Sequence, residues 1–90
     1  MCTMIAEKVK VEGSGKGTSG WFSLTQANVS YDHPFDAPYQ YALNIDFVNE
    51  SLGPSARVAV ELSESAARDL VRTILSALDQ AEAGGHLPQK

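Results

Sequence analysis

The stretch SESAARDLVRTILSALDQAEA, residues 63–83, is the longest segment of the chain with a regular apolar repeat. Its apolar residues recur at steps of three and four, which places them on one face of an α-helix. That face consists of Ala67, Leu70, Val71, Ile74, Ala77, Leu78 and Ala81. The sequence therefore predicts an amphipathic helix over residues 64–83.

Both ends of this helix carry recognisable signals. Ser63 has an N-cap side chain, and Gly84 with Gly85 follows the last apolar position as a stop. Glu64 precedes Arg68 by four residues, the favourable order for an intrahelical ion pair. We expect Leu70 and Ile74 to be buried against the rest of the domain.

Four strands are predicted ahead of the helix, at residues 4–12, 21–31, 39–49 and 57–62. The third has the clearest two-residue alternation, formed by Tyr39, Tyr41, Leu43, Ile45 and Phe47. In the second strand the bulky residues switch from even-numbered to odd-numbered positions, which favours a bulge near Gln26. The glycine-rich segment 13–20 is expected to be a flexible loop, and residues 84–90 a loose tail.

Consecutive strands with short connections usually pair with their neighbours in antiparallel fashion. The fold class expected is α+β, with a four-stranded antiparallel β-sheet in ββββα order and the C-terminal helix packed on one face. Ninety residues form a single domain, 1–90.

Composition excludes several functional classes. The net charge of −4 argues against binding to nucleic acid or to an anionic membrane surface. No apolar run is long enough to span a membrane, and Cys2 is the single cysteine, without a partner for an internal disulfide. We expect an acidic cytoplasmic protein.

Several short runs resemble a known family. They are MCTMIAE at residues 1–7, YDHP at 31–34, ALNIDFVN at 42–49 and VAVEL at 58–62. Together they resemble a small bacterial protein family of unknown function. The resemblance implies a compact bacterial domain; it implies no activity and no catalytic residue.

The loop at residues 31–41 holds the best candidates for a ligand site. Asp32, His33 and Asp36 place two carboxylates and an imidazole close together, as an acid/base pair or the start of a metal site would. Aromatic side chains that line small-molecule pockets are available from Trp21, Tyr39 and Tyr41. Ordinary turn chemistry for the aspartates and a role in the core for the aromatic residues are the alternatives.

Two functional hypotheses follow. In the first the chain is a non-enzymatic homo-oligomeric or binding module, with no catalytic residue, cofactor or metal. In the second it is a small-molecule or metal-binding protein, or a small enzyme, that uses Asp32 and His33. The first is favoured because no nucleophile, base and orienting group stand out. GKGTSG at residues 15–20 matches a nucleotide-binding spacing, but the strand that follows favours a hairpin connector.

A covering argument predicts a homodimer. A four-stranded sheet is about 19 Å wide, whereas one helix with its side chains is about 10 to 12 Å across. One helix therefore leaves an apolar strip of the sheet uncovered, and a second copy of the chain can bury it.

Overall fold

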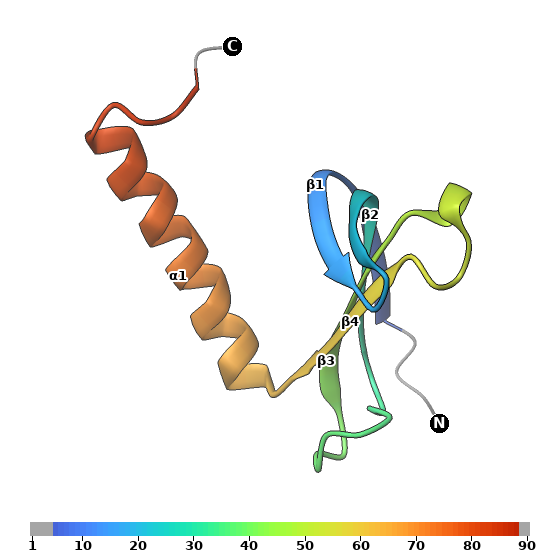
Figure 1. Cartoon of the computed structure of the whole chain (residues 1–90). Helices are drawn as coiled ribbons and strands as arrows, with labels where there is room; N and C mark the ends of the chain where they lie inside the picture. The colour runs from blue at the N-terminus through green and yellow to red at the C-terminus, as the bar shows by residue number, and fades with distance from the viewer. Residues whose placement is uncertain (1–4, 89–90) are drawn as a thin grey trace.

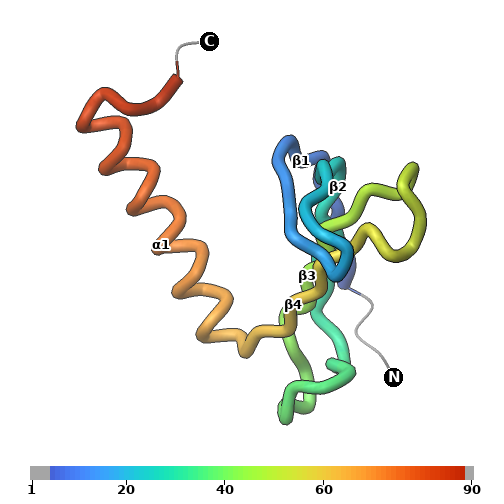
Figure 2. Tube along the Cα trace, in the orientation of Figure 1, coloured from blue at the N-terminus to red at the C-terminus, as the bar shows by residue number. Residues whose placement is uncertain are grey.

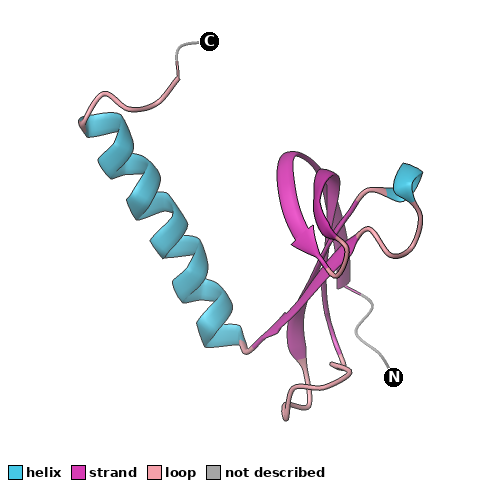
Figure 3. Cartoon of the chain, in the orientation of Figure 1, coloured by secondary structure: helices cyan, strands magenta, loops and turns pink. Residues whose placement is uncertain are grey.

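The structure is a computed structural model that describes residues 5–88. This part of the chain forms an antiparallel sheet of four strands followed by one long helix (Figures 1 and 3). The strands are β1 (Ile5–Gly17), β2 (Gly20–Asp32), β3 (Ala42–Val48) and β4 (Arg57–Leu62). A short 3-10 turn, η1 (Glu50–Leu52), precedes β4, and the helix is α1 (Glu64–Ala83). The predicted α+β class and element order are confirmed.

The predicted ends of α1 are also confirmed. The Ser63 hydroxyl accepts a hydrogen bond from the backbone N–H of Ala66 at 3.2 Å, which satisfies a donor of the first turn. At the other end Gly85 has a φ of 76°, and the N–H of His86 donates to the carbonyl of Ala81 at 2.8 Å. Glycine suits this position at the end of the helix, because a residue with a side chain would be strained at a positive φ.

The sheet runs in the order β1-β2-β3-β4, so each strand pairs with its sequence neighbours. Val29, Ile45 and Val60 lie opposite one another across β2, β3 and β4. Residues one position along, such as Asn28 and Asp46, are paired on the opposite face. One face of the sheet is therefore apolar in its central part, and the other is polar.

The glycine-rich segment is part of the sheet, and the prediction of a loop over residues 13–20 is wrong. β1 continues to Gly17, and only Thr18 and Ser19 form the turn to β2. The side chains of β2 explain the glycines, because a Cβ on Gly15 would lie 3.1 Å from Leu24 Cδ2. On Gly17 it would lie 3.2 Å from Phe22 Cε1. Glycine lets the large side chains of one strand lie across the backbone of the other.

The start of β3 and the position of the bulge also differ from the prediction. β3 begins at Ala42, because Tyr39 and Tyr41 belong to an irregular loop that follows Pro38. The register of β1 and β2 shifts between Lys10 and Gly13, at the level of Gln26. The sequence predicts a bulge near Gln26 in the second strand. The irregularity lies at this level, but in β1.

α1 departs from the sheet along its length. It begins directly after β4, and its far end lies well away from the strands (Figures 1 and 2). Leu70 and Ile74, which we expected to be buried, are 43% and 49% exposed within one chain. These side chains are exposed because α1 and the sheet lie on either side of an open cleft and do not form a closed core.

Little of the described chain is fully buried. Its buried apolar residues are Ala27, Ala42 and Ala56, and no large side chain among residues 5–88 is completely inaccessible. No helix in this range is long and apolar enough to cross a membrane. Cys2 and the predicted start of the first strand at Met4 lie outside the described residues.

Candidate functional site

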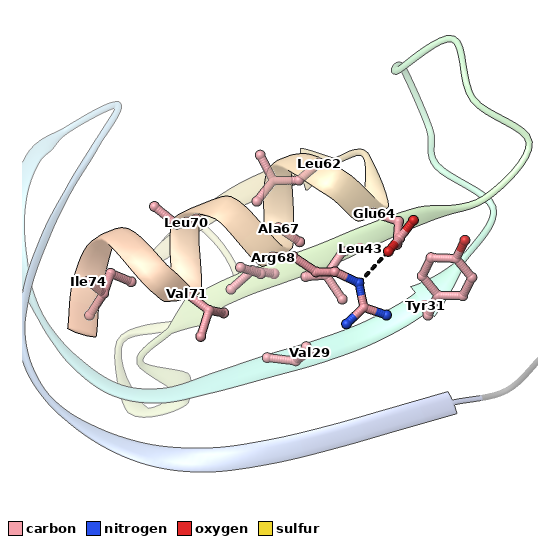
Figure 4. Close-up of a pocket in the computed structure, with 11 residues that line it drawn as sticks. Val29, Tyr31, Leu43, Leu62, Glu64, Ala67, Arg68, Leu70, Val71 and Ile74 are labelled. Carbon is pink, nitrogen blue, oxygen red and sulfur yellow. Dashed lines mark hydrogen bonds and ion pairs between the residues drawn. The ribbon is translucent and has the colours of Figure 1, made fainter. Parts of the chain in front are cut away.

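A cleft with a volume of about 770 Å³ lies between α1 and the apolar face of the sheet (Figure 4). Its sheet wall is aliphatic and aromatic, and comes from β2, β3 and β4. The sheet residues are Val29, Tyr31, Leu43, Ile45 and Leu62. The helix wall is formed by Glu64, Ala67, Arg68, Leu70, Val71 and Ile74. Most of the residues that line the cleft are therefore apolar.

One ion pair lies at the edge of this cleft. Arg68 Nε donates to the carboxylate of Glu64 one helical turn earlier, near Tyr31 in Figure 4. The hydrogen bond and the charge of Glu64 raise the pKa of Arg68 above its usual value. The pair was predicted from its i, i+4 spacing.

The candidate acid/base residues of the 31–41 loop bond within the loop itself. Asp32 Oδ1 accepts a hydrogen bond from the backbone N–H of His33 at 2.7 Å. His33 Nδ1 lies 2.9 Å from the carbonyl oxygen of Gln40, so the imidazole joins the two ends of the loop. The cleft-lining residues include neither Asp32 nor His33. Both residues hold the loop.

Three rings stack from this loop towards the cleft. His33 stacks on Tyr41 with ring centroids 4.8 Å apart, and Tyr41 stacks on Tyr31 at 5.9 Å. Tyr31 in turn lines the cleft. The stack therefore connects the loop to one end of the apolar surface, and it includes Tyr41, one of the predicted aromatic residues.

The other predicted site residues are dispersed. Trp21 lies in β2 next to the turn and is 70% exposed, and Tyr39 is 46% exposed in the loop. Asp36 contributes its backbone N–H to a contact with Glu61. Within residues 5–88 no three His, Cys, Asp or Glu side chains are grouped as a metal site would require. A ligand site at the loop stays a prediction.

Glu61 organises the loop, although no pattern in the sequence predicted this role. Its carboxylate accepts hydrogen bonds from the backbone N–H groups of Phe35 at 2.6 Å, Ala37 at 2.9 Å and Asp36 at 3.0 Å. These bonds lower the pKa of Glu61, and the bonds from Ala37 and then Phe35 contribute most to the shift. The only signal in the sequence is an acidic residue at an outward position of β4, which by itself indicates a solvated face.

Asn49 is a second structural residue that pattern alone did not identify. It is 6% exposed, and its Nδ2 donates to the carbonyl of Ser23 at 2.9 Å. Its Oδ1 accepts from the N–H and the hydroxyl of Ser51 at 3.2 and 2.7 Å. The side chain thus joins the turn before β4 to β2.

Comparison with known proteins identifies the family of the chain. A family model described as "Family of unknown function (DUF6295)" matches residues 1–87, so the chain belongs to this family. No curated protein and no solved structure matches the chain. The match confirms the expected resemblance to a family of unknown function, which carries no activity to transfer.

Proposed function

As membership of the DUF6295 family supplies no activity, we propose from the shape of the chain that it is a homodimeric, non-enzymatic interaction module. The cleft and the helix face beside it form the self-association surface. The observation that carries the proposal is the amount of surface that one chain leaves exposed.

One chain has a solvent-accessible surface of 7057 Å². A compact monomer of 9.7 kDa has about 5,100 Å², so this chain exposes about 1,900 Å² more. Its radius of gyration is 15.1 Å, against about 12 Å for a compact domain of 90 residues. The excess is large enough for an obligate interface, since such dimers bury roughly 1,000 Å² or more per subunit.

The excess surface includes an apolar stripe on α1. Its large aliphatic side chains are 43% to 57% exposed, and they are Leu70, Val71, Ile74, Leu75 and Leu78. Five such side chains on one helix exceed the scattered apolar residues of an ordinary monomer surface. A second copy is the economical partner, because two-fold symmetry buries the same stripe on both chains at once.

The cleft lining favours association over catalysis. Its walls are mainly aliphatic, and its charged members, Glu64 and Arg68, neutralise each other at the edge. Such a surface suits the hydrophobic centre of a protein interface. The hydrogen bonds of Asp32 and His33 within their own loop also support a structural role for them.

The proposal is tested by comparing the wild type with two helix variants in size-exclusion chromatography with light scattering. We expect the wild type to have a mass near twice 9.7 kDa. Leu78→Asp places a charge in the apolar stripe and should shift the protein to monomer or unfold it. Ser76→Asp adds the same charge on the polar side of the same helix and should keep the dimer mass.

A wild-type mass near 9.7 kDa from micromolar to submillimolar concentration would refute the dimer. A dimer mass for Leu78→Asp equal to that of Ser76→Asp would remove α1 from the interface.

A further inference from the structure

The two edges of the sheet differ in how well they are protected from another strand. β1 and β4 are the outer strands, so within the described chain each has one side without a strand neighbour. β1 carries Glu7, Lys8 and Lys10, and its register with β2 shifts before Gly13. Charged residues and bulges of this kind keep an edge from pairing. β4 contains no lysine, proline or glycine, and its register with β3 is regular, so β4 is the less protected edge.

The side chains of β4 form a pattern that is complementary to itself. Val58 and Val60 lie on the apolar face of the sheet and are half-buried, and β-branched residues of this kind favour strands. Ala59 lies between them on the polar face and is exposed. On that face Arg57 precedes Ala59 by two residues and Glu61 follows it by two, with opposite charges. The strand therefore matches a reversed copy of itself about Ala59.

Resting on the proposed homodimer, we propose that β4 pairs with the β4 of a second copy, antiparallel, about a two-fold axis at Ala59 and perpendicular to the sheet. Ala59 then lies opposite the partner's Ala59, and Val58 lies opposite the partner's Val60. Arg57 lies opposite the partner's Glu61, and symmetry repeats this pair. A shift of two residues in either direction would set both charged residues against uncharged ones.

The two charged side chains have bonding capacity left for a partner. Arg57 binds Asp46 of its own chain through Nε at 3.0 Å and Nη2 at 2.8 Å, and its side chain is 49% exposed. A guanidinium has five N–H donors, so it can bind a second carboxylate. Glu61 accepts three backbone hydrogen bonds from its loop, whereas a carboxylate offers about four acceptor positions. Opposite charges directly across two strands stabilise their pairing.

The direction of the axis decides what lies on each side of the joined sheet. An axis perpendicular to the sheet keeps the apolar faces of both copies on one side, and with them both clefts and both α1 helices. The apolar surfaces of the proposed function are thereby brought next to each other. A two-fold axis along the strands would instead join the apolar face of one copy to the polar face of the other. Antiparallel pairing is the arrangement that suits the faces.

β1 does not offer a second copy the same match. An axis at Glu7, Lys8 or Lys10 would set that residue against its own charge. An axis at Val9 would set Lys8 against the partner's Lys10. Like charges directly opposite each other across two strands are destabilising. Pairing between copies is therefore expected at β4 and not at β1.

Cysteine cross-linking tests the position of the axis. In a Cys2→Ser background, Ala59→Cys should form a covalent dimer on oxidation with copper phenanthroline, because a residue on the axis lies opposite its own copy. Lys8→Cys, at an exposed position of the other edge strand, is the matched control. We expect Ala59→Cys to cross-link at least about tenfold faster, since a disulfide needs Cβ atoms about 4 Å apart. Equal rates in a dimeric protein would overturn the β4 pairing and leave the homodimer standing.

Isotope-filtered NMR tests the register without changing the interface. In a dimer of one ¹³C-labelled and one unlabelled chain, nuclear Overhauser contacts should join the Val58 methyl groups to those of the partner's Val60. The Val9 methyl groups of β1 are the control and should show no contact with the partner. A dimer whose contacts between chains leave out Val58 and Val60 would contradict the pairing. A monomeric wild type would refute the proposed function itself.

Discussion

Asn49 joins segments that are far apart in the sequence. Its amide contacts Ser23 of β2 and Ser51 of η1 while the residue is almost completely buried. Buried polar groups that lose their partner cost more than the bond itself contributed, because they have also lost water. Removing the side chain would take the hydrogen-bond partner away from the Ser23 carbonyl and from the Ser51 N–H.

We expect Asn49→Ala to lower the free energy of unfolding by about 1 to 3 kcal/mol. Asn28→Ala is the matched control, because Asn28 accepts one bond from Gln26 on a half-buried face. Urea denaturation followed by circular dichroism measures both. Equal midpoints for the two variants would show that the Asn49 contacts add nothing to stability.

Glu61 holds the 31–41 loop through its carboxylate, so the loop should respond to acid. The folded-state pKa of Glu61 is lowered below its ordinary value of 4.5. Its stabilisation is therefore fully present above the unfolded-state pKa and is lost as the pH falls through the lower folded-state pKa. At neutral pH the loop is held, and below pH 4.5 it should loosen progressively.

Backbone amide NMR measures this directly. The N–H signals of Phe35, Asp36 and Ala37 should shift together on acidification, and Glu61→Gln should bring those shifts towards their acid-state values at pH 7. Glu7→Gln, a change to an exposed glutamate of β1, should leave them unchanged. Three independent titration curves in the wild type would contradict a single controlling carboxylate.

At the scale of elements, the hairpin of β1 and β2 shows how glycine serves close packing. Gly13 has open space around it, whereas a Cβ on Gly15 would press on Leu24 and approach Val58 of β4. Replacing a strand glycine with alanine normally raises the stability of the protein, since glycine loses more backbone entropy on folding. We expect Gly13→Ala to be neutral or stabilising, and Gly15→Ala to be less stable than it by about 1 kcal/mol. Thermal unfolding of the two variants measures the difference, and equal stability would show that Leu24 moves aside freely.

The elements also show what the sequence could reveal. The period of α1 and the capping residues Ser63 and Gly85 are local signals, so the helix was predicted with its bounds. The glycine hairpin was missed because its reason lies in Leu24 and Phe22 of another strand. The role of Glu61 depends on a loop 25 residues earlier in the chain, a contact that no local pattern contains.

At the scale of the whole molecule, α1 and the apolar face of the sheet lie on either side of an open cleft. The covering argument expected α1 to pack on this face, and the homodimer that it predicts stays a prediction. With three alanines as the buried apolar residues of the described range, one chain has little core to offset the entropy of folding. If the proposed homodimer forms, we expect folding and association to be one event.

The most direct measurement of this claim is the thermal unfolding midpoint of the wild type as a function of protein concentration. If two chains fold by associating, the midpoint rises steadily with concentration, because mass action favours the dimer. Calorimetry across a hundredfold range, with the Ser76→Asp variant alongside, should show parallel increases for both proteins. A midpoint independent of concentration over that range, together with a monomeric mass, would contradict the account.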